Sequence, residues 1–130
     1  MPPDTLSSFA DRRAYYRINV MLPMCLQGET DDTQPELLER TVNLSVGGIG
    51  VIVNTPYEPH DILTLTMRFH DQVLFNAFIE VLRVDLIEAH HIRSYRLHAR
   101  FIRMPAQDQE RLIRYVMWFQ REHLARHYSA

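Results

Sequence analysis

The chain has 130 residues, of which 46% are hydrophobic and 23% charged, a composition typical of a single globular domain with a sizeable core. Its formal net charge of −2 argues against a general nucleic-acid-binding protein, because such proteins usually carry a basic face. The single cysteine, Cys25, excludes an intramolecular disulfide and favours a reducing compartment. No apolar run is long enough for a membrane span, and the first residues lack the pattern of a signal peptide. We therefore expect a cytoplasmic protein.

The first part of the chain predicts a flexible lead-in followed by β-structure. Residues 1–12 contain several proline and serine residues and no apolar pattern, as in a flexible terminus. After them, apolar and polar residues alternate in six segments separated by polar or glycine-bearing turns, and this period of two marks half-buried strands. The predicted strands cover 18–26, 38–45, 49–53, 63–69, 73–86 and 95–101. Six short strands without an intervening helix predict a small antiparallel barrel.

After Pro105 the apolar period changes to three or four residues, which predicts an amphipathic helix over 106–126. Pro105 suits a first helical turn, and acidic residues follow it at the positive end of the helix dipole. The apolar stripe consists of Leu112, Ile113, Val116, Phe119 and Leu124, and Tyr115, Met117 and Trp118 lie beside it. Because this apolar surface is broader than docking on one barrel face requires, we expect the helix to contact a partner protein or a second copy. Closure of the barrel end by Trp118 is the alternative.

Two short motifs flank the first two strands. Arg13 and Arg17 stand four residues apart at the start of the first strand, with Arg12 directly before them. Asn43, Ser45 and Gly48 stand where the second strand turns into the third, and form an [D/N]xSxxG pattern. In this order the motifs resemble the signature of the PilZ family, bacterial receptors for the second messenger cyclic di-GMP. The resemblance covers residues 12–104.

The resemblance implies a six-stranded antiparallel β-barrel capped by one C-terminal helix, which agrees with the periodicity. It divides the chain into a lead-in (1–12), a barrel (13–104) and a helix with its tail (105–130), the last two forming one domain. It also implies a non-enzymatic receptor that needs no cofactor or metal and changes a partner-binding surface when the RxxxR segment closes over the ligand. The alternative is a PilZ-like interaction adaptor that has lost ligand binding.

The residue types of the motifs suit a cyclic dinucleotide. Arginine pairs with phosphate, forks onto the O6 and N7 edge of guanine and stacks on purines. In extended chain, Arg13 and Arg17 point the same way and lie roughly 13 Å apart. Since Val42 and Leu44 face inward, we expect Asn43 and Ser45 to face outward and to hydrogen-bond the ligand. For Gly48 we expect either close backbone approach or a positive φ.

Other candidate sites are weaker in this sequence. Arg83, late in the predicted fifth strand, is a further candidate for a stacking contact. The seven histidines show no metal-ligand spacing, and solvated side chains are expected at His90, His91 and His98. No nucleophile elbow, P-loop or dinucleotide fingerprint occurs. A barrel that binds single-stranded nucleic acid is disfavoured by the net charge and by the absence of lysine.

Overall fold

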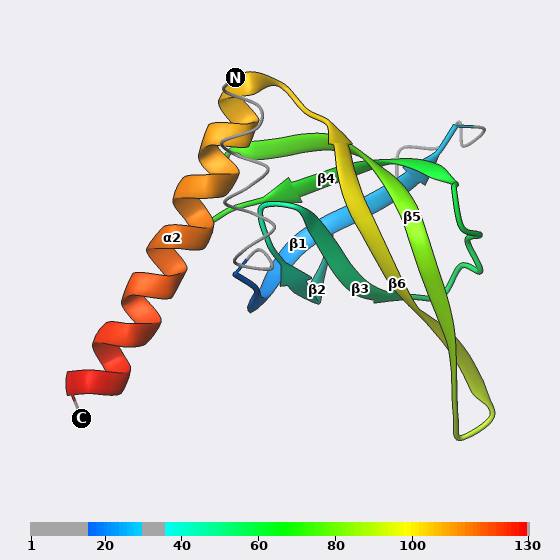
Figure 1. The fold of residues 1–130 in the computed structure, drawn as a ribbon. Helices are drawn as coiled ribbons and strands as arrows, with labels where there is room; N and C mark the ends of the chain where they lie inside the picture. Colours follow the sequence, from blue (N-terminus) through cyan, green and yellow to red (C-terminus); the bar gives the residue numbers. More distant parts are fainter. Residues whose placement is uncertain (1–15, 30–35, 130) are drawn as a thin grey trace.

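The structure is a computed structural model that describes residues 16–29 and 36–129, with the side chains described up to residue 123. Within these residues, six antiparallel strands close into a barrel in the order β1-β2-β3-β6-β5-β4, and one long helix follows (Figure 1). The elements are β1 (Ile18–Gly28), β2 (Leu38–Leu44), β3 (Gly48–Val53), β4 (Ile62–Arg68), β5 (Leu74–Ala89), β6 (Ile92–Arg103) and α2 (Ala106–Ser129). The predicted fold class, a six-stranded antiparallel barrel with a C-terminal helix, is confirmed.

The barrel interior is filled by the apolar residues of the alternating pattern. In β3, for example, Ile49, Val51 and Val53 are buried, whereas Ile52 between them is exposed. Full burial of each such side chain contributes about 1.5–3 kcal/mol to stability, so the period of two determines which strand face turns inward. The largest fully buried apolar side chains belong to Met24, Leu44, Ile49, Leu65, Met67, Phe75, Ile79, Leu97 and Leu112.

The β5–β6 hairpin is longer than the sequence predicts. Its strands continue to Ala89 and restart at Ile92, whereas the alternation predicted strands over 73–86 and 95–101. The two residues between them, His90 and His91, have φ values of 51° and 65°, and tight two-residue hairpin turns require such positive values. The sequence does not indicate this turn, because two histidines occupy the positions where such turns usually have Asn-Gly. The hairpin therefore extends beyond the barrel, on the side away from α2 (Figure 1).

The first half of α2 is attached to the turn between β4 and β5. Arg111 donates hydrogen bonds to the carbonyl oxygens of Val73 (2.9 Å) and Leu74 (2.8 Å), and Asp108 accepts the backbone N–H of Asn76 at 3.2 Å. These contacts use backbone groups that the barrel's own strand pairing leaves available. As a result, α2 packs against one end of the barrel (Figure 1). Among the described residues, no helix is both long and apolar enough to cross a membrane.

The buried face of α2 differs from the predicted stripe at one position. Tyr115, expected beside the stripe, is buried with Leu112 and Val116, and its ring stacks on Phe69 at a centroid distance of 4.5 Å. The reason is that Phe69 follows β4 and fills the barrel end at the place where Tyr115 arrives. Trp118 remains 37% exposed and Met117 52% exposed. The side chain of Leu124 lies outside the described residues.

Candidate ligand-binding groove

The structure brings the two sequence motifs together across the β1–β2 pair. Asn19 pairs with Asn43 in the antiparallel register, so Asn43 lies next to the start of β1. Arg17 donates from Nη1 to Oδ1 of Asn43 at 2.8 Å, and Nδ2 of Asn43 donates to Oδ1 of Asn19 at 3.0 Å. The uncharged amide thus orients the arginine by a hydrogen bond instead of a salt bridge. Arg12 and Arg13 lie outside the described residues.

The expectation that Ser45 faces outward is wrong. Ser45 is 1% exposed, and its Oγ accepts the backbone N–H groups of Gly47 (3.3 Å) and Gly48 (3.1 Å) and donates to the carbonyl oxygen of Gly48 (3.3 Å). The alternation of β2 ends at Leu44, so the next side chain is placed by the turn and no longer by the pleat. In this structure, Ser45 holds together the turn that carries the motif.

Gly48 is required by close packing. A Cβ atom at this position would lie 2.3 Å from the carbonyl oxygen of Ala99 on β6. Of the two reasons expected for this glycine, close backbone approach is therefore correct, although the approaching backbone is that of β6. The other is wrong, because no glycine in the described residues has a positive φ.

Next to these motifs lies a groove with a volume of about 750 Å³, in the range of pockets for small organic ligands. Residues from the start of β1 and from β2, β3, β5 and β6 line it: Arg17, Asn19, Thr41, Asn43, Gly50, Val51, Ile52, Leu82, Arg83, Arg96 and His98. Gly50 lies between Asn43 and His98, so no side chain fills the space between these two.

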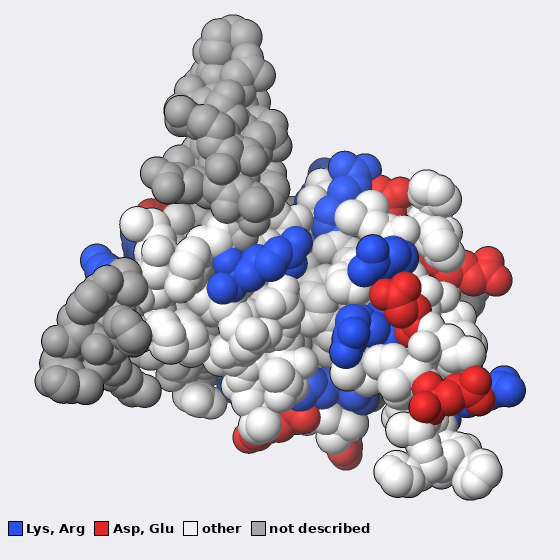
Figure 2. All heavy atoms as spheres, turned by 60° about the horizontal axis from the view of Figure 1, so that its bottom comes forward, with Lys and Arg blue, Asp and Glu red and all other residues white. Residues whose placement is uncertain are grey.

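The lining of the groove is positively charged although the whole chain carries a net charge of −2. It includes three arginines and no acidic residue. Figure 2 shows acidic side chains close to basic ones on one face of the molecule. Asp85 pairs with Arg83 but is not part of the lining. An anion would thus find a favourable local potential in the groove without a generally basic protein.

Arg83 reaches the groove because of a bulge in β5. The β5–β6 register shifts between Val81 and Arg83, so that Leu82 is an extra residue and Arg83 pairs with His98. Arg83 therefore lines the groove. Its stacking contact with a ligand stays a prediction. Arg96 and His98 were missed as site residues. Alternation in β6 places both on the outer face, but only the pairing of β6 with β3 brings that face near Asn43.

The surroundings of His98 favour its neutral form. Burial is the main cause that lowers its pKa below the ordinary 6.5, and the nearby positive charge of Arg83 is the next. The Nη2 of Arg83 lies 3.2 Å from Nε2 of His98, and since a guanidinium has only donors, this Nε2 accepts. Arg83 also pairs with Asp85 through Nε at 3.2 Å.

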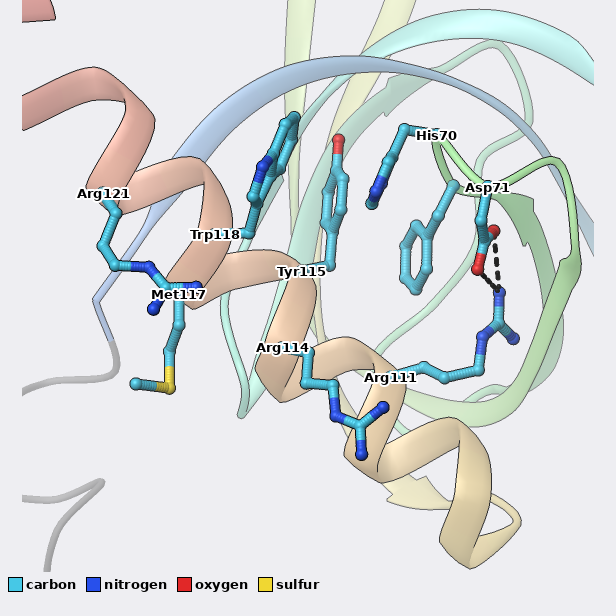
Figure 3. Close-up of a pocket in the computed structure, with 9 residues that line it drawn as sticks. His70, Asp71, Arg111, Arg114, Tyr115, Met117, Trp118 and Arg121 are labelled. Carbon is cyan, nitrogen blue, oxygen red and sulfur yellow. Dashed lines mark hydrogen bonds and ion pairs between the residues drawn. The ribbon is translucent and has the colours of Figure 1, made fainter. Parts of the chain in front are cut away.

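A second hollow, of about 460 Å³, lies between the β4–β5 turn and α2 and contains no motif residue (Figure 3). Figure 3 shows the rings of Tyr115, Trp118 and His70 next to one another. The ring centroids of His70 and Trp118 are 4.5 Å apart at an interplanar angle of 10°. Arg111 also lines this hollow and pairs with Asp71. In the described residues no group of three or more His, Cys, Asp or Glu could hold a metal ion in either place.

The chain is similar to one known protein family and to several solved structures. The family model described as PilZ domain matches residues 11–118. Among curated proteins none matches the chain. Three similar solved structures are YcgR of Escherichia coli in complex with c-di-GMP, a tetrameric PilZ domain protein of Xanthomonas campestris self-assembled via a helical bundle, and the inhibitor of motility MotI/DgrA of Bacillus subtilis.

These likenesses concern the fold. YcgR superimposes with a TM-score of 0.67 at 19% identity over 91% of this chain and 50% of its own. The Xanthomonas protein gives 0.66 at 16% identity over 92% and 98%, and MotI/DgrA gives 0.65 at 20% over 85% and 52%. The chain therefore spans about half the length of YcgR and of MotI/DgrA.

Proposed function

This chain belongs to the PilZ domain family, and from that premise we propose that it is a receptor for cyclic di-GMP. The observation that carries the proposal is the hydrogen bond between Arg17 and Asn43, because it unites both family motifs at the edge of a positively charged groove. Cyclic di-GMP offers two phosphodiester charges and two guanine edges, which arginine and amide side chains recognise. The complex of the structurally similar YcgR with c-di-GMP supports the same ligand.

The proposed receptor uses its motifs in two ways. Arg12, Arg13 and Arg17 contact the phosphates and guanines, and the segment that carries them closes over the ligand. Asn43 contacts a guanine edge, whereas Ser45 and Gly48 belong to the site through the turn whose backbone they shape. The barrel over 13–104 and the helix with its tail over 105–130 act as one domain. In this proposal, binding of the ligand makes and breaks no covalent bond, so the protein works as a signal receptor and not as an enzyme. The proposed receptor is bacterial and cytoplasmic.

Calorimetric titration with cyclic di-GMP tests this proposal. We expect saturable binding with a defined stoichiometry, weakened by added salt because phosphate contacts are screened. Amide exchange around residues 12–17 is expected to become slower in the complex, since closure protects the backbone. Exchange that is unchanged at saturation would contradict closure while leaving binding intact. If titration produced no binding heat at any accessible concentration of cyclic di-GMP, the receptor proposal would be contradicted. The alternative, a PilZ-like interaction adaptor without ligand binding, would then remain.

The signal is proposed to leave the domain through the exposed aromatic surface of α2. Tyr115 is buried at the barrel end, whereas Trp118 and Met117 are partly exposed and can make a further contact. Trp118 stacks on His70 in the hollow of Figure 3, and Trp, Tyr, Met and Arg are residue types enriched in the centres of protein interfaces. A partner protein or a second copy of the chain is expected to cover this surface.

Trp118→Ala separates an interface from a purely structural role. We expect loss of self-association, measured by sedimentation, or loss of partner binding, at a melting temperature close to that of the unchanged protein. Tyr115→Ala is the matched control, because its buried ring supports the barrel end and its removal costs about 3–5 kcal/mol, as for buried aromatic rings. A large fall in stability for Trp118→Ala, with assembly unchanged, would show that Trp118 only closes the barrel.

A further inference from the structure

The groove has a second wall that the family motifs do not include. Arg17 and Asn43 form one side, at the β1–β2 pair. Arg83, Arg96 and His98 come from the β5–β6 hairpin, and we call them the hairpin wall. The bulge at Leu82 turns Arg83 into register with His98, so that both side chains emerge on the groove face of the hairpin.

The two arginines of the hairpin wall are available to an anion. Arg96 is exposed and makes no hydrogen bond or ion pair with any other described residue. Arg83, which also lines the groove, contacts Asp85 through Nε and His98 through Nη2, so its Nη1 has no partner among the described residues. Asp85 itself does not line the groove. Guanidinium groups with unpaired N–H donors form charge-assisted hydrogen bonds with phosphate oxygens.

We propose that Arg83 and Arg96 bind the half of the cyclic dinucleotide that faces away from Arg17, with His98 as a third ligand contact between them. This inference rests on the proposed function, since it takes cyclic di-GMP as the ligand. A cyclic dinucleotide carries one phosphodiester in each half, and the hairpin wall adds positive charge to the groove from a second pair of strands. It thereby makes the β5–β6 hairpin part of the binding site.

Proton uptake by His98 accompanies this mode of binding. In the free protein, burial and the charges of Arg83, Arg96 and Arg17 lower the pKa of His98, and Asp85 opposes them. Arg100, two residues further along the same face of β6, is paired with Glu80. A bound phosphodiester neutralises the positive charges around His98, so the pKa of His98 rises in the complex. Protonated Nε2 then becomes a donor to the ligand, and Arg83 exchanges its bond to His98 for one to the phosphate.

The experiment is calorimetric titration of cyclic di-GMP into the full chain and into Arg83→Ala, Arg96→Ala and Arg93→Ala. Arg93 is the matched control, because it lies on the same hairpin, pairs with Glu88 and does not line the groove. We expect Arg83→Ala and Arg96→Ala each to weaken binding by roughly tenfold or more, the usual cost of a lost charge-assisted hydrogen bond. Arg93→Ala should bind as the unchanged protein does.

A pH series adds a measurement that a merely structural role would not alter. Affinity of the unchanged protein should rise from about pH 8 to about pH 5.5, because a group whose pKa is higher in the complex takes up a proton on binding. His98→Gln should flatten this dependence. Melting temperatures confirm folding, and Arg83→Gln and Arg96→Gln replace any alanine variant that fails to fold.

The outcomes distinguish the two proposals. Binding by the unchanged protein together with unimpaired binding by both Arg83→Ala and Arg96→Ala overturns the hairpin wall and leaves the receptor proposal standing. Absence of binding by the unchanged protein overturns the receptor proposal and the hairpin wall with it. Selective weakening in the two groove variants, with Arg93→Ala unaffected, supports both.

Discussion

Arg17→Ala is expected to abolish measurable binding of cyclic di-GMP while the melting temperature changes little. Arg17 is exposed, and its hydrogen bond to Asn43 at 2.8 Å joins two surface side chains. The net contribution of such a bond to stability is about 1 kcal/mol or less. In the complex the same guanidinium is expected to make at least two charge-assisted hydrogen bonds, each of about 1.5–3 kcal/mol, so affinity should fall roughly a hundredfold or more.

Arg13→Ala should weaken binding similarly, since it removes the other arginine of the RxxxR motif. Arg114→Ala serves as the control, because Arg114 is an exposed arginine of α2 that pairs with Glu110 and does not line the groove. Calorimetry and thermal unfolding of the three variants separate affinity from stability. If Arg17→Ala bound as tightly as the Arg114→Ala control, the assignment of the motif to ligand binding would be wrong.

Gly48→Ala is expected to destabilise the fold strongly, even though Gly48 belongs to a ligand-binding signature. The added Cβ would lie 2.3 Å from a backbone carbonyl oxygen of β6, and a backbone atom cannot move aside as a side chain can. Overpacking at such a place costs about 1–3 kcal/mol or more, and it should lower the melting temperature by roughly 5 °C or more. Thermal or urea unfolding measures this directly.

Gly50→Ala is the matched control on the same strand. Its added Cβ would lie 3.5 Å from Cβ of Asn43 and 3.7 Å from Nδ1 of His98, which are ordinary contact distances. Stability should therefore change little, whereas binding should weaken, because the methyl group fills space between the two walls of the groove. Equal destabilisation by both substitutions would show that contact of Gly48 with β6 is not what requires glycine there.

Local pattern was sufficient to predict the elements of this fold. Alternation in β3 and the three-to-four period of α2 both report burial of one face, and the geometry of a single strand or helix determines which residues share a face. The RxxxR and [D/N]xSxxG motifs could likewise be recognised from spacing alone. Where local geometry changes, the pattern failed: Ser45 follows the end of β2 and is turned inward, and the His90–His91 turn lacks the residues that usually announce one.

The grouping of the site residues was decided by tertiary structure. Nothing in the spacing of Asn43 and His98 says that they flank the same glycine, because this depends on β3 pairing with both β2 and β6. The bulge in β5 that brings Arg83 beside His98 is equally non-local, since it is defined against the partner strand. Tyr115 is buried for the same kind of reason: its partner Phe69 belongs to a distant strand end. A periodic pattern specifies which way a side chain points within its own element, whereas its neighbours depend on how the strands close into a barrel, and that closure is a property of the whole chain.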